Sequence, residues 1–152
     1  MNGDEIRELR LRYGLTQAQV AHAAGLRQPA LSAMENGRRG SVTAFERVRC
    51  AILAIVRPSE VLDDRMRTEV TGILSSYGAT NIRVFGSVAR GADGPGSDLD
   101  LIAEFPRTLD LFELMEAESA VEAMVGVPVD IVSDTPRTAF ALKRAKAEAV
   151  PL

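Results

Sequence analysis

Apolar residues recur at three- and four-residue spacing at the start of the chain, with charged residues between them. Ile6, Leu9 and Tyr13 mark one face of a helix over residues 4–13. Gly14 follows and ends the helix, because a glycine just beyond the last turn interrupts the pattern. The first segment is therefore expected to be an amphipathic helix.

Three further helical segments follow, with short breaks between them. Thr16 can cap a helix that ends at Gly25, and a third helix begins around Gln28 with Pro29 in its tolerant first turn. Thr43 opens a fourth helix. It carries the apolar residues Phe45, Val48, Ile52 and Leu53. Two short helices joined by a glycine-containing turn and framed by two more predict a helix-turn-helix arrangement.

The helical pattern is interrupted at residues 57–60, which read RPSE. Pro58 disfavours a helical conformation at Arg57, so we place a domain boundary there. The expected domains cover residues 1–57 and residues 58–152.

Helical and strand patterns alternate in the second domain. β-Branched and aromatic residues bounded by turn signals predict the strands, and helical periodicity predicts the helices. The expected elements are a helix over 61–77, a strand over 81–86, a short helix over 88–90, a strand over 97–105, a helix over 109–126, a strand over 127–133 and a helix over 136–150. The chain is therefore expected to be α+β overall, with an all-α first domain and a small α/β second domain that has a mixed sheet with flanking helices.

Charge is distributed unevenly between the two expected domains. The whole chain carries a net charge of -3, but residues 1–57 hold 9 Lys/Arg against 5 Asp/Glu and residues 58–152 hold 9 against 16. The first domain is thus net +4 and the second net -7. A basic domain can approach a polyanion, whereas an acidic one repels it unless cations intervene. We therefore expect the two domains to have different partners.

The single cysteine, Cys50, excludes an intrachain disulfide and a zinc site built from cysteines. Its place in a helical apolar pattern predicts a buried structural thiol. No apolar stretch is long enough to cross a bilayer, and the charged start MNGDEIRELRLRYG is unlike a secretory signal peptide. A cytoplasmic protein without a membrane partner is expected.

The stretch LRLRYGLTQAQVAHAAGLRQPALSAMENGRR resembles the Cro/repressor-like (XRE) helix-turn-helix family, with its LTQ…A…G…S…E.G.R signature nearly complete. The resemblance implies operator DNA binding with the third helix in the major groove, usually as a dimer. The implied DNA-binding residues are Gln28 and Ser32 for bases, Gln17, Arg38 and Arg39 for phosphates, and Arg27. Alternatively, the arginines form only a solvated face and the domain serves for dimerisation.

A different kind of motif occupies residues 84–105, VFGSVARGADGPGSDLDLIAEF. Side chains along a strand alternate between its two faces, so Asp98 and Asp100 share one face. Asp130 can join them if the second and third strands of this domain pair. Neighbouring carboxylates raise each other's pKa values unless a cation neutralises them. An all-oxygen ligand set with open positions suits Mg²⁺ that is completed by waters and substrate phosphates.

Gly86 and Ser87 form a turn just before these carboxylates. Backbone N–H groups in such a turn can bind an anion, Gly86 lets a phosphate approach the main chain closely, and Ser87 adds a hydroxyl donor. A phosphate-binding turn beside a carboxylate-held metal is the minimum apparatus for phosphoryl-type transfer. Taken singly, Gly86 and Gly91 read as turn glycines, and Arg90 reads as the ion-pair partner of an acidic residue.

The sequence GSVARGADGPGSDLDL resembles the GSxARGxxxxxSDxDL signature of minimal nucleotidyltransferases in the DNA polymerase beta superfamily. The resemblance covers roughly residues 62–152 and extends to EAV near the end of the chain. It implies that ATP is the substrate and that two Mg²⁺ ions bind to Asp98 and Asp100, with Asp130 as third ligand and base. The residues implied to contact the nucleotide are Gly86, Ser87, Arg90 and Ser97.

Minimal nucleotidyltransferases of this type resemble the antitoxins of HEPN/MNT toxin–antitoxin pairs, which transfer AMP from ATP to a tyrosine of a HEPN ribonuclease toxin. A Cro-like domain suits an antitoxin that represses its own operon. The leading hypothesis is therefore a DNA-binding antitoxin that adenylylates its toxin, as a homodimer or in a larger complex with it. Two alternatives are an antitoxin that masks its toxin without catalysis and an antibiotic-type nucleotidyltransferase that modifies a small molecule.

Overall fold

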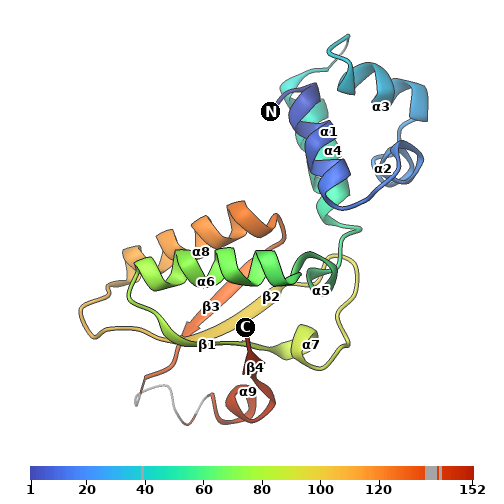
Figure 1. Cartoon of the computed structure of the whole chain (residues 1–152). Coiled ribbons are helices and arrows are strands. Elements are labelled where there is room, and N and C mark those ends of the chain that lie inside the picture. Colours follow the sequence, from blue (N-terminus) through green and yellow to red (C-terminus); the bar gives the residue numbers. More distant parts are fainter. Residues whose placement is uncertain (39, 136–139, 141) are drawn as a thin grey trace. The chain divides into compact units, whose positions relative to one another are not determined.

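The computed structural model describes residues 1–38, 40–135, 140 and 142–152. The chain forms two compact units, Met1–Val56 and Arg57–Leu152 (Figure 1). Within the described residues the first unit is helical, and the second combines helices with a mixed four-stranded sheet. The α+β class predicted from the sequence is therefore confirmed.

The first unit is built from α1 (Gly3–Arg12), α2 (Gln17–Ala23), α3 (Gln28–Glu35) and α4 (Val42–Leu53). Helices α2 and α3 pack on each other, and α1 packs against both α3 and α4. The apolar side chains that the helical spacing turns inward form one core. Its most buried members are Ile6, Val20, Ala21, Leu31, Val48 and Ile52.

Side-chain caps mark the start of α2 and of α4. The Thr16 side chain accepts the Gln19 N–H at the start of α2, as the sequence predicted. Helix α4 begins at Val42 instead of Thr43, because the Ser41 side chain accepts the Ala44 N–H and so caps the helix earlier. A cap of this kind stabilises a helix by about 1 kcal/mol.

The prediction of a buried Cys50 is wrong, because Cys50 is exposed. The buried residues of α4 are Val48, Ala51 and Ile52. Cys50 stands two positions from both Val48 and Ile52, and residues two apart on a helix point in different directions. The thiol therefore lies outside the stripe that packs into the core.

The second unit contains five helices and four strands within its described residues, and their order along the chain is mixed. They are α5 (Pro58–Val61), α6 (Asp64–Ser76), β1 (Thr80–Phe85), α7 (Gly86–Ala89), β2 (Leu99–Glu104), α8 (Leu111–Val125), β3 (Val129–Ser133), α9 (Lys143–Glu148) and β4 (Val150–Pro151). The strand order is β3-β2-β1-β4. Strands β2 and β3 are parallel, and β1 is antiparallel to both β2 and β4.

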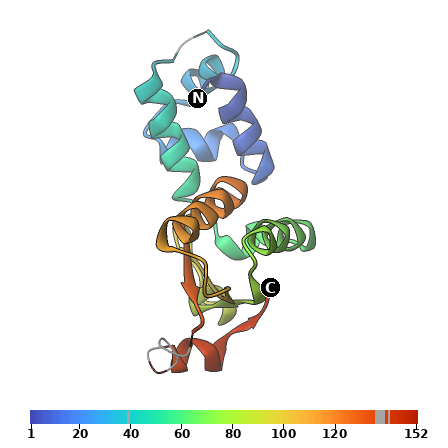
Figure 2. The same ribbon diagram turned by 90° about the vertical axis from the view of Figure 1, so that its left-hand side faces the viewer.

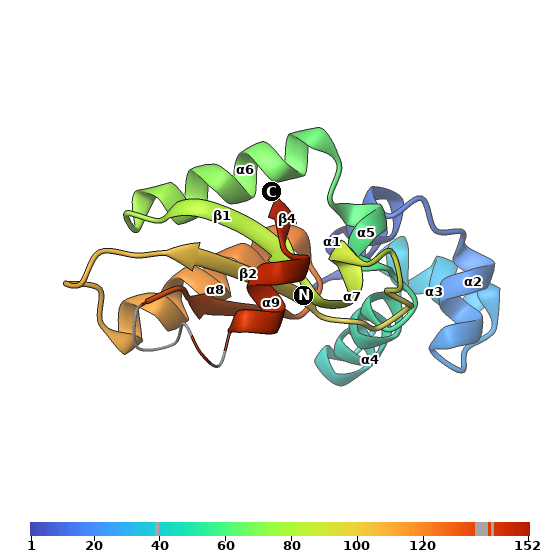
Figure 3. The same cartoon turned by 90° about the horizontal axis from the view of Figure 1, so that it is seen from below.

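Helices cover both faces of this sheet. Helices α6 and α8 pack on each other and cover one face (Figure 2), and α9 lies across the other face beside α7 (Figure 3). Coverage on both sides explains why Leu99, Leu101 and Ile102 are all fully buried although consecutive strand residues point in opposite directions. The remaining large, fully buried residues are Val70, Leu74, Val84 and Val121.

Two expected helices differ from the structure. The helix expected over 61–77 is interrupted at Leu62 and restarts as α6, because the Asp63 side chain accepts the Met66 N–H as an N-cap. The helix expected over 136–150 is partly outside the described residues, since 136–139 and 141 are not described. In the described part only Lys143–Glu148 is helical.

The chain ends in a strand that the sequence did not predict. Val150 pairs with Val84 and Pro151 with Arg83, so β4 lies along the edge of β1. A proline lacks an N–H donor and is tolerated in an edge strand. The Leu152 N–H then donates to the Ile82 carbonyl at 3.1 Å. The open edge of β1, which is a tertiary feature, decides this conformation.

Candidate functional site

Three aspartates meet at one edge of the sheet in the second unit. The parallel register of β2 and β3 pairs Asp100 with Asp130, and Asp98 stands one residue before β2 begins. Asp98 and Asp130 are exposed, whereas Asp100 is half-buried. None of the three carboxylates forms a hydrogen bond or ion pair with another described residue. The strand pairing that the carboxylate cluster requires is therefore present.

The surroundings of Asp100 disfavour its negative charge. Burial raises the pKa of Asp100, and the nearby carboxylates of Asp130 and Asp98 raise it further. Arg90 acts in the opposite direction without reversing the shift. A carboxylate in such surroundings is stabilised when it takes up a proton or binds a cation.

The carboxylates do not by themselves form a closed metal cage. Across the described residues, no three His, Cys, Asp or Glu side chains converge closely enough to hold an ion alone. Mg²⁺ is usually bound through one or two carboxylates, with waters and substrate phosphates as its other ligands. The unpaired oxygens of Asp98, Asp100 and Asp130 fit that kind of site, in which the substrate completes the coordination.

The Gly86 turn brings the main chain against these carboxylates. Strand β1 ends at Phe85, and Gly86 adopts a positive φ of 69° that turns the chain into α7. A Cβ atom on Gly86 would overlap the Oδ2 atom of Asp100. Only glycine satisfies both conditions. The next residue, Ser87, is half-buried, and its hydroxyl makes no hydrogen bond with any other described residue.

Arg90 and Ser97, both predicted to contact nucleotide, have protein partners. Arg90 Nη1 lies 2.9 Å from each carboxylate oxygen of Glu148. The Ser97 hydroxyl oxygen accepts the Gly94 N–H at 2.9 Å and so closes the loop before Asp98. Glu148 belongs to the EAV segment to which the family resemblance extends, but the sequence did not name it as a site residue.

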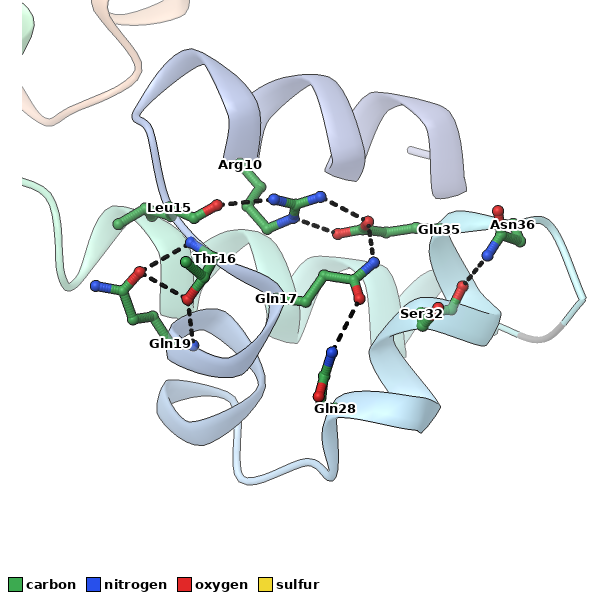
Figure 4. Close-up of polar contacts among 9 residues, drawn as sticks. All are labelled: Arg10, Leu15, Thr16, Gln17, Gln19, Gln28, Ser32, Glu35 and Asn36. Carbon is green, nitrogen blue, oxygen red and sulfur yellow. Dashed lines mark hydrogen bonds and ion pairs between the residues drawn. The ribbon is translucent and has the colours of Figure 1, made fainter.

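A buried ion pair organises the first unit (Figure 4). Arg10 donates to Glu35 through Nε at 2.7 Å and through Nη2 at 3.0 Å, and to the Leu15 carbonyl through Nη1 at 2.7 Å. Gln17 Nε2 donates to the same Glu35 carboxylate at 2.8 Å. Burial alone would raise the pKa of Glu35, but the hydrogen bonds from Arg10 and Gln17 hold it below its usual value.

The residues predicted to contact DNA lie at the start of α3 and around it. Gln28 is the first residue of α3, and its Nε2 lies 3.5 Å from Gln17 Oε1 (Figure 4), a long contact that leaves Gln28 exposed. Ser32 is half-buried one turn further along α3. Arg27 and Arg38 are exposed. Arg39 lies outside the described residues. The DNA contacts of this set stay predictions.

Comparison with protein families decides the nature of the second unit. The family model described as nucleotidyltransferase domain matches residues 67–150, which is more than half of the chain. The chain belongs to the nucleotidyltransferase family. A model described as helix-turn-helix matches residues 6–45, so the nucleotidyltransferase domain follows a helix-turn-helix domain in the same chain.

Individual relatives agree with this assignment. "Putative protein adenylyltransferase MJ1215" of Methanocaldococcus jannaschii is 31% identical over 68 residues, which cover 45% of this chain and 79% of the relative. "Protein adenylyltransferase MntA" of Thermococcus cleftensis is 38% identical over 56 residues, which cover 37% of this chain and 57% of the relative. Both relatives carry the name protein adenylyltransferase.

A solved structure described as "Structure of putative minimal nucleotidyltransferase" has the same fold over the matched region. It superposes with a TM-score of 0.52 at 39% sequence identity, over 62% of this chain and 95% of that one. The prediction that this chain is a nucleotidyltransferase enzyme is confirmed. None of the helices in the described part of this nucleotidyltransferase has both the length and the apolar character that a membrane span requires.

Proposed function

We propose that this protein is the DNA-binding antitoxin of a HEPN/MNT toxin–antitoxin pair and transfers AMP from ATP to a tyrosine of its HEPN ribonuclease toxin. One observation carries the catalytic part: unpaired Asp98, Asp100 and Asp130 lie beside a glycine turn that only glycine can form. The relatives named protein adenylyltransferases support a protein acceptor over a small molecule.

The proposed chemistry assigns a role to each side chain of the site. Asp98 and Asp100 would hold two Mg²⁺ ions, with Asp130 as third ligand; such ions polarise phosphate oxygens and stabilise the charge of the leaving group. The Ser87 hydroxyl donates to a phosphate oxygen of ATP. Asp130 accepts the proton of the tyrosine hydroxyl. That oxygen forms a bond to the α-phosphorus, the bond between the α- and β-phosphates breaks, and pyrophosphate leaves.

The helix-turn-helix domain supports a second role on DNA. Its matched family model, its net charge of +4 over residues 1–57 and the exposed Gln28 at the start of α3 favour binding to an operator. We propose that the protein represses its own operon, as a homodimer or together with the toxin, and that it works in the cytoplasm.

The experiment that tests the catalytic proposal uses a candidate HEPN toxin that binds this protein. The purified pair is incubated with ATP and Mg²⁺, and the mass of the intact toxin is measured. We expect an AMP adduct with the wild-type protein and none with the Asp98→Asn/Asp100→Asn variant, which should still bind DNA. A toxin that binds the wild-type protein but gains no AMP would contradict catalysis and favour neutralisation by masking.

A further inference from the structure

The end of the chain returns to the turn at Gly86. Glu148 is the last residue of α9, and Arg90 caps the C-terminus of α7. Arg90 Nη1 lies 2.9 Å from both Oε1 and Oε2 of Glu148. The Glu148 carboxylate therefore holds the residue that ends α7, although Arg90 and Glu148 are 58 residues apart in the sequence.

The strand β4 determines where Glu148 lies. Val150 in β4 pairs with Val84 in β1, two residues before Gly86. The chain that leads into β4 is thus held alongside the chain that leads into the turn. Helices α7 and α9 pack on each other at this place. The Glu148 side chain is 22% exposed against 46% for Arg90, so the carboxylate is the more enclosed partner of the pair.

A segment like α7 needs such support. A helix of four residues is far too short to be stable by itself, because the cost of its first turn is not recovered by propagation. Glycine has the largest backbone freedom of any residue type, so Gly86 makes the start of α7 more flexible. The carboxylate of Glu148 binds the arginine at the end of α7, so it restricts this short helix.

Gly86 and Ser87 contribute to the turn in different ways. The Ser87 hydroxyl has no hydrogen-bond partner among the described residues. Gly86 then contributes the absence of a side chain beside Asp100, and Ser87 contributes the donor for phosphate. The direction in which Ser87 points depends on how α7 is held.

We propose that Glu148 is a positioning residue for nucleotide binding: through Arg90 it orients α7 and the turn before it so that Ser87 meets the phosphates of ATP. This inference rests on the proposed function of the turn. It differs from a blocking role, in which the carboxylate would occupy the place of a phosphate and would have to leave before ATP binds.

The test uses the full-length protein and the variants Glu148→Ala, Glu148→Gln and Arg90→Ala. We measure MgATP affinity by calorimetry and, with the toxin, KM for ATP and kcat. We expect Glu148→Ala to weaken MgATP binding about tenfold and to raise KM more than it lowers kcat, because it removes charge-assisted hydrogen bonds outside the reacting atoms. Glu148→Gln keeps an oxygen that accepts from Arg90 Nη1 and should lose less.

A double variant and a matched control sharpen the test. Arg90→Ala/Glu148→Ala should be no worse than the more affected single variant, because both residues act through one contact. Lys146→Ala removes the 3.0 Å ion pair of α9 with Asp134 without touching the turn, and it should leave MgATP affinity within about twofold of wild type. Thermal unfolding of each variant shows whether the fold is retained.

Each remaining outcome is decisive. Unchanged MgATP affinity in Glu148→Ala overturns the inference, and tighter binding shows that the carboxylate blocks the site. If the wild-type protein binds MgATP but transfers no AMP to the toxin, the proposed acceptor is wrong while the affinity series still decides the role of Glu148. If the wild-type protein does not bind MgATP, both proposals are wrong.

Discussion

Asp100 in β2 lies directly beside Asp130 in β3, because the two strands run parallel in a register that pairs these residues. Two acidic side chains at paired positions of adjacent strands repel each other. Burial and this repulsion both raise the pKa of Asp100. The protein thus keeps an unfavourable arrangement of charge at the edge where the proposed metal would bind.

Replacing Asp100 with asparagine should therefore stabilise the metal-free protein at neutral pH. A carboxyl whose pKa is raised by folding contributes stability only while it is protonated, and this contribution is lost as the pH rises through the raised pKa. Asparagine does not ionise, so the Asp100→Asn variant does not lose stability in this way as the pH rises. Thermal unfolding with a chelator should show a Tm advantage for Asp100→Asn near pH 7.5 that shrinks toward about pH 4.

The control for this comparison is Glu116→Gln, which removes one charge from an exposed position of α8. Its Tm should differ little from wild type across the same pH range. Added Mg²⁺ should raise the Tm of the wild-type protein and not that of Asp100→Asn. An Asp100→Asn variant that is less stable than wild type at neutral pH would show that the carboxylate has a structural role.

Alanine at Gly86 should be more harmful than alanine at Gly91. Both glycines have positive φ angles, 69° and 65°, so both variants carry backbone strain of about 1–2 kcal/mol. Only at Gly86 would the new Cβ overlap Asp100, whereas at Gly91 it has nothing within 4 Å. Urea unfolding should show an additional destabilisation of about 1–3 kcal/mol for Gly86→Ala. Equal losses at the two positions would mean that the turn relaxes away from Asp100.

Breaking the buried ion pair of the first unit should strongly destabilise that unit. Glu35→Ala leaves the Arg10 guanidinium buried without its partner, which costs about 3–5 kcal/mol. The matched control is Glu46→Ala, whose partner Arg49 is more exposed, and it should cost at most about 1 kcal/mol. Denaturant unfolding followed by circular dichroism measures both. Similar losses would show that solvent reaches the Arg10–Glu35 pair.

Substitutions at Gln28 and Arg38 should separate base recognition from phosphate binding on DNA. Gln28→Ala should weaken binding to the protein's own promoter by about 1–3 kcal/mol and leave binding to a scrambled duplex nearly unchanged. Arg38→Ala should weaken binding to both duplexes by a similar factor. It should also reduce the number of counterions released on binding by about one, which lowers the slope of affinity against salt concentration. Fluorescence anisotropy at several salt concentrations measures each effect.

The control for the DNA experiment is Arg65→Ala in α6 of the second unit, where Arg65 pairs with Glu69 at 2.8 Å. It removes one positive charge outside the helix-turn-helix domain and should alter neither affinity nor salt dependence. A loss at Gln28 that is the same on both duplexes would exclude a base contact there.

Local patterns predicted much of this molecule correctly. The spacing of Ile6, Val20 and Leu31 identified the inward faces of three helices, and all three residues are fully buried. Thr16 was recognised as a cap from its position before the second helix. These features depend on residues within one or two turns of each other, so their physics is contained in a short stretch of sequence.

Features that depend on packing or on pairing between distant residues were harder to predict from the sequence. The exposed Cys50, the break at Leu62 and the strand β4 all differ from the predictions. In each case a helical pattern continued through the residues concerned, and packing or pairing elsewhere decided the outcome. Propensity is a weak preference that the edge of a sheet or a competing cap can override.

The sequence by itself determined the chemistry of the proposed site, because Gly86, Ser87, Asp98 and Asp100 stand close together in one signature. It named Asp130 only on the condition that two strands pair, and the tertiary structure met that condition through the parallel register. Glu148 lies in the EAV segment of the resemblance, but its contact with the turn was decided by the tertiary structure. Its contact with Arg90 spans 58 residues and forms because β4 pairs with β1, an interaction between distant strands that no local pattern encodes.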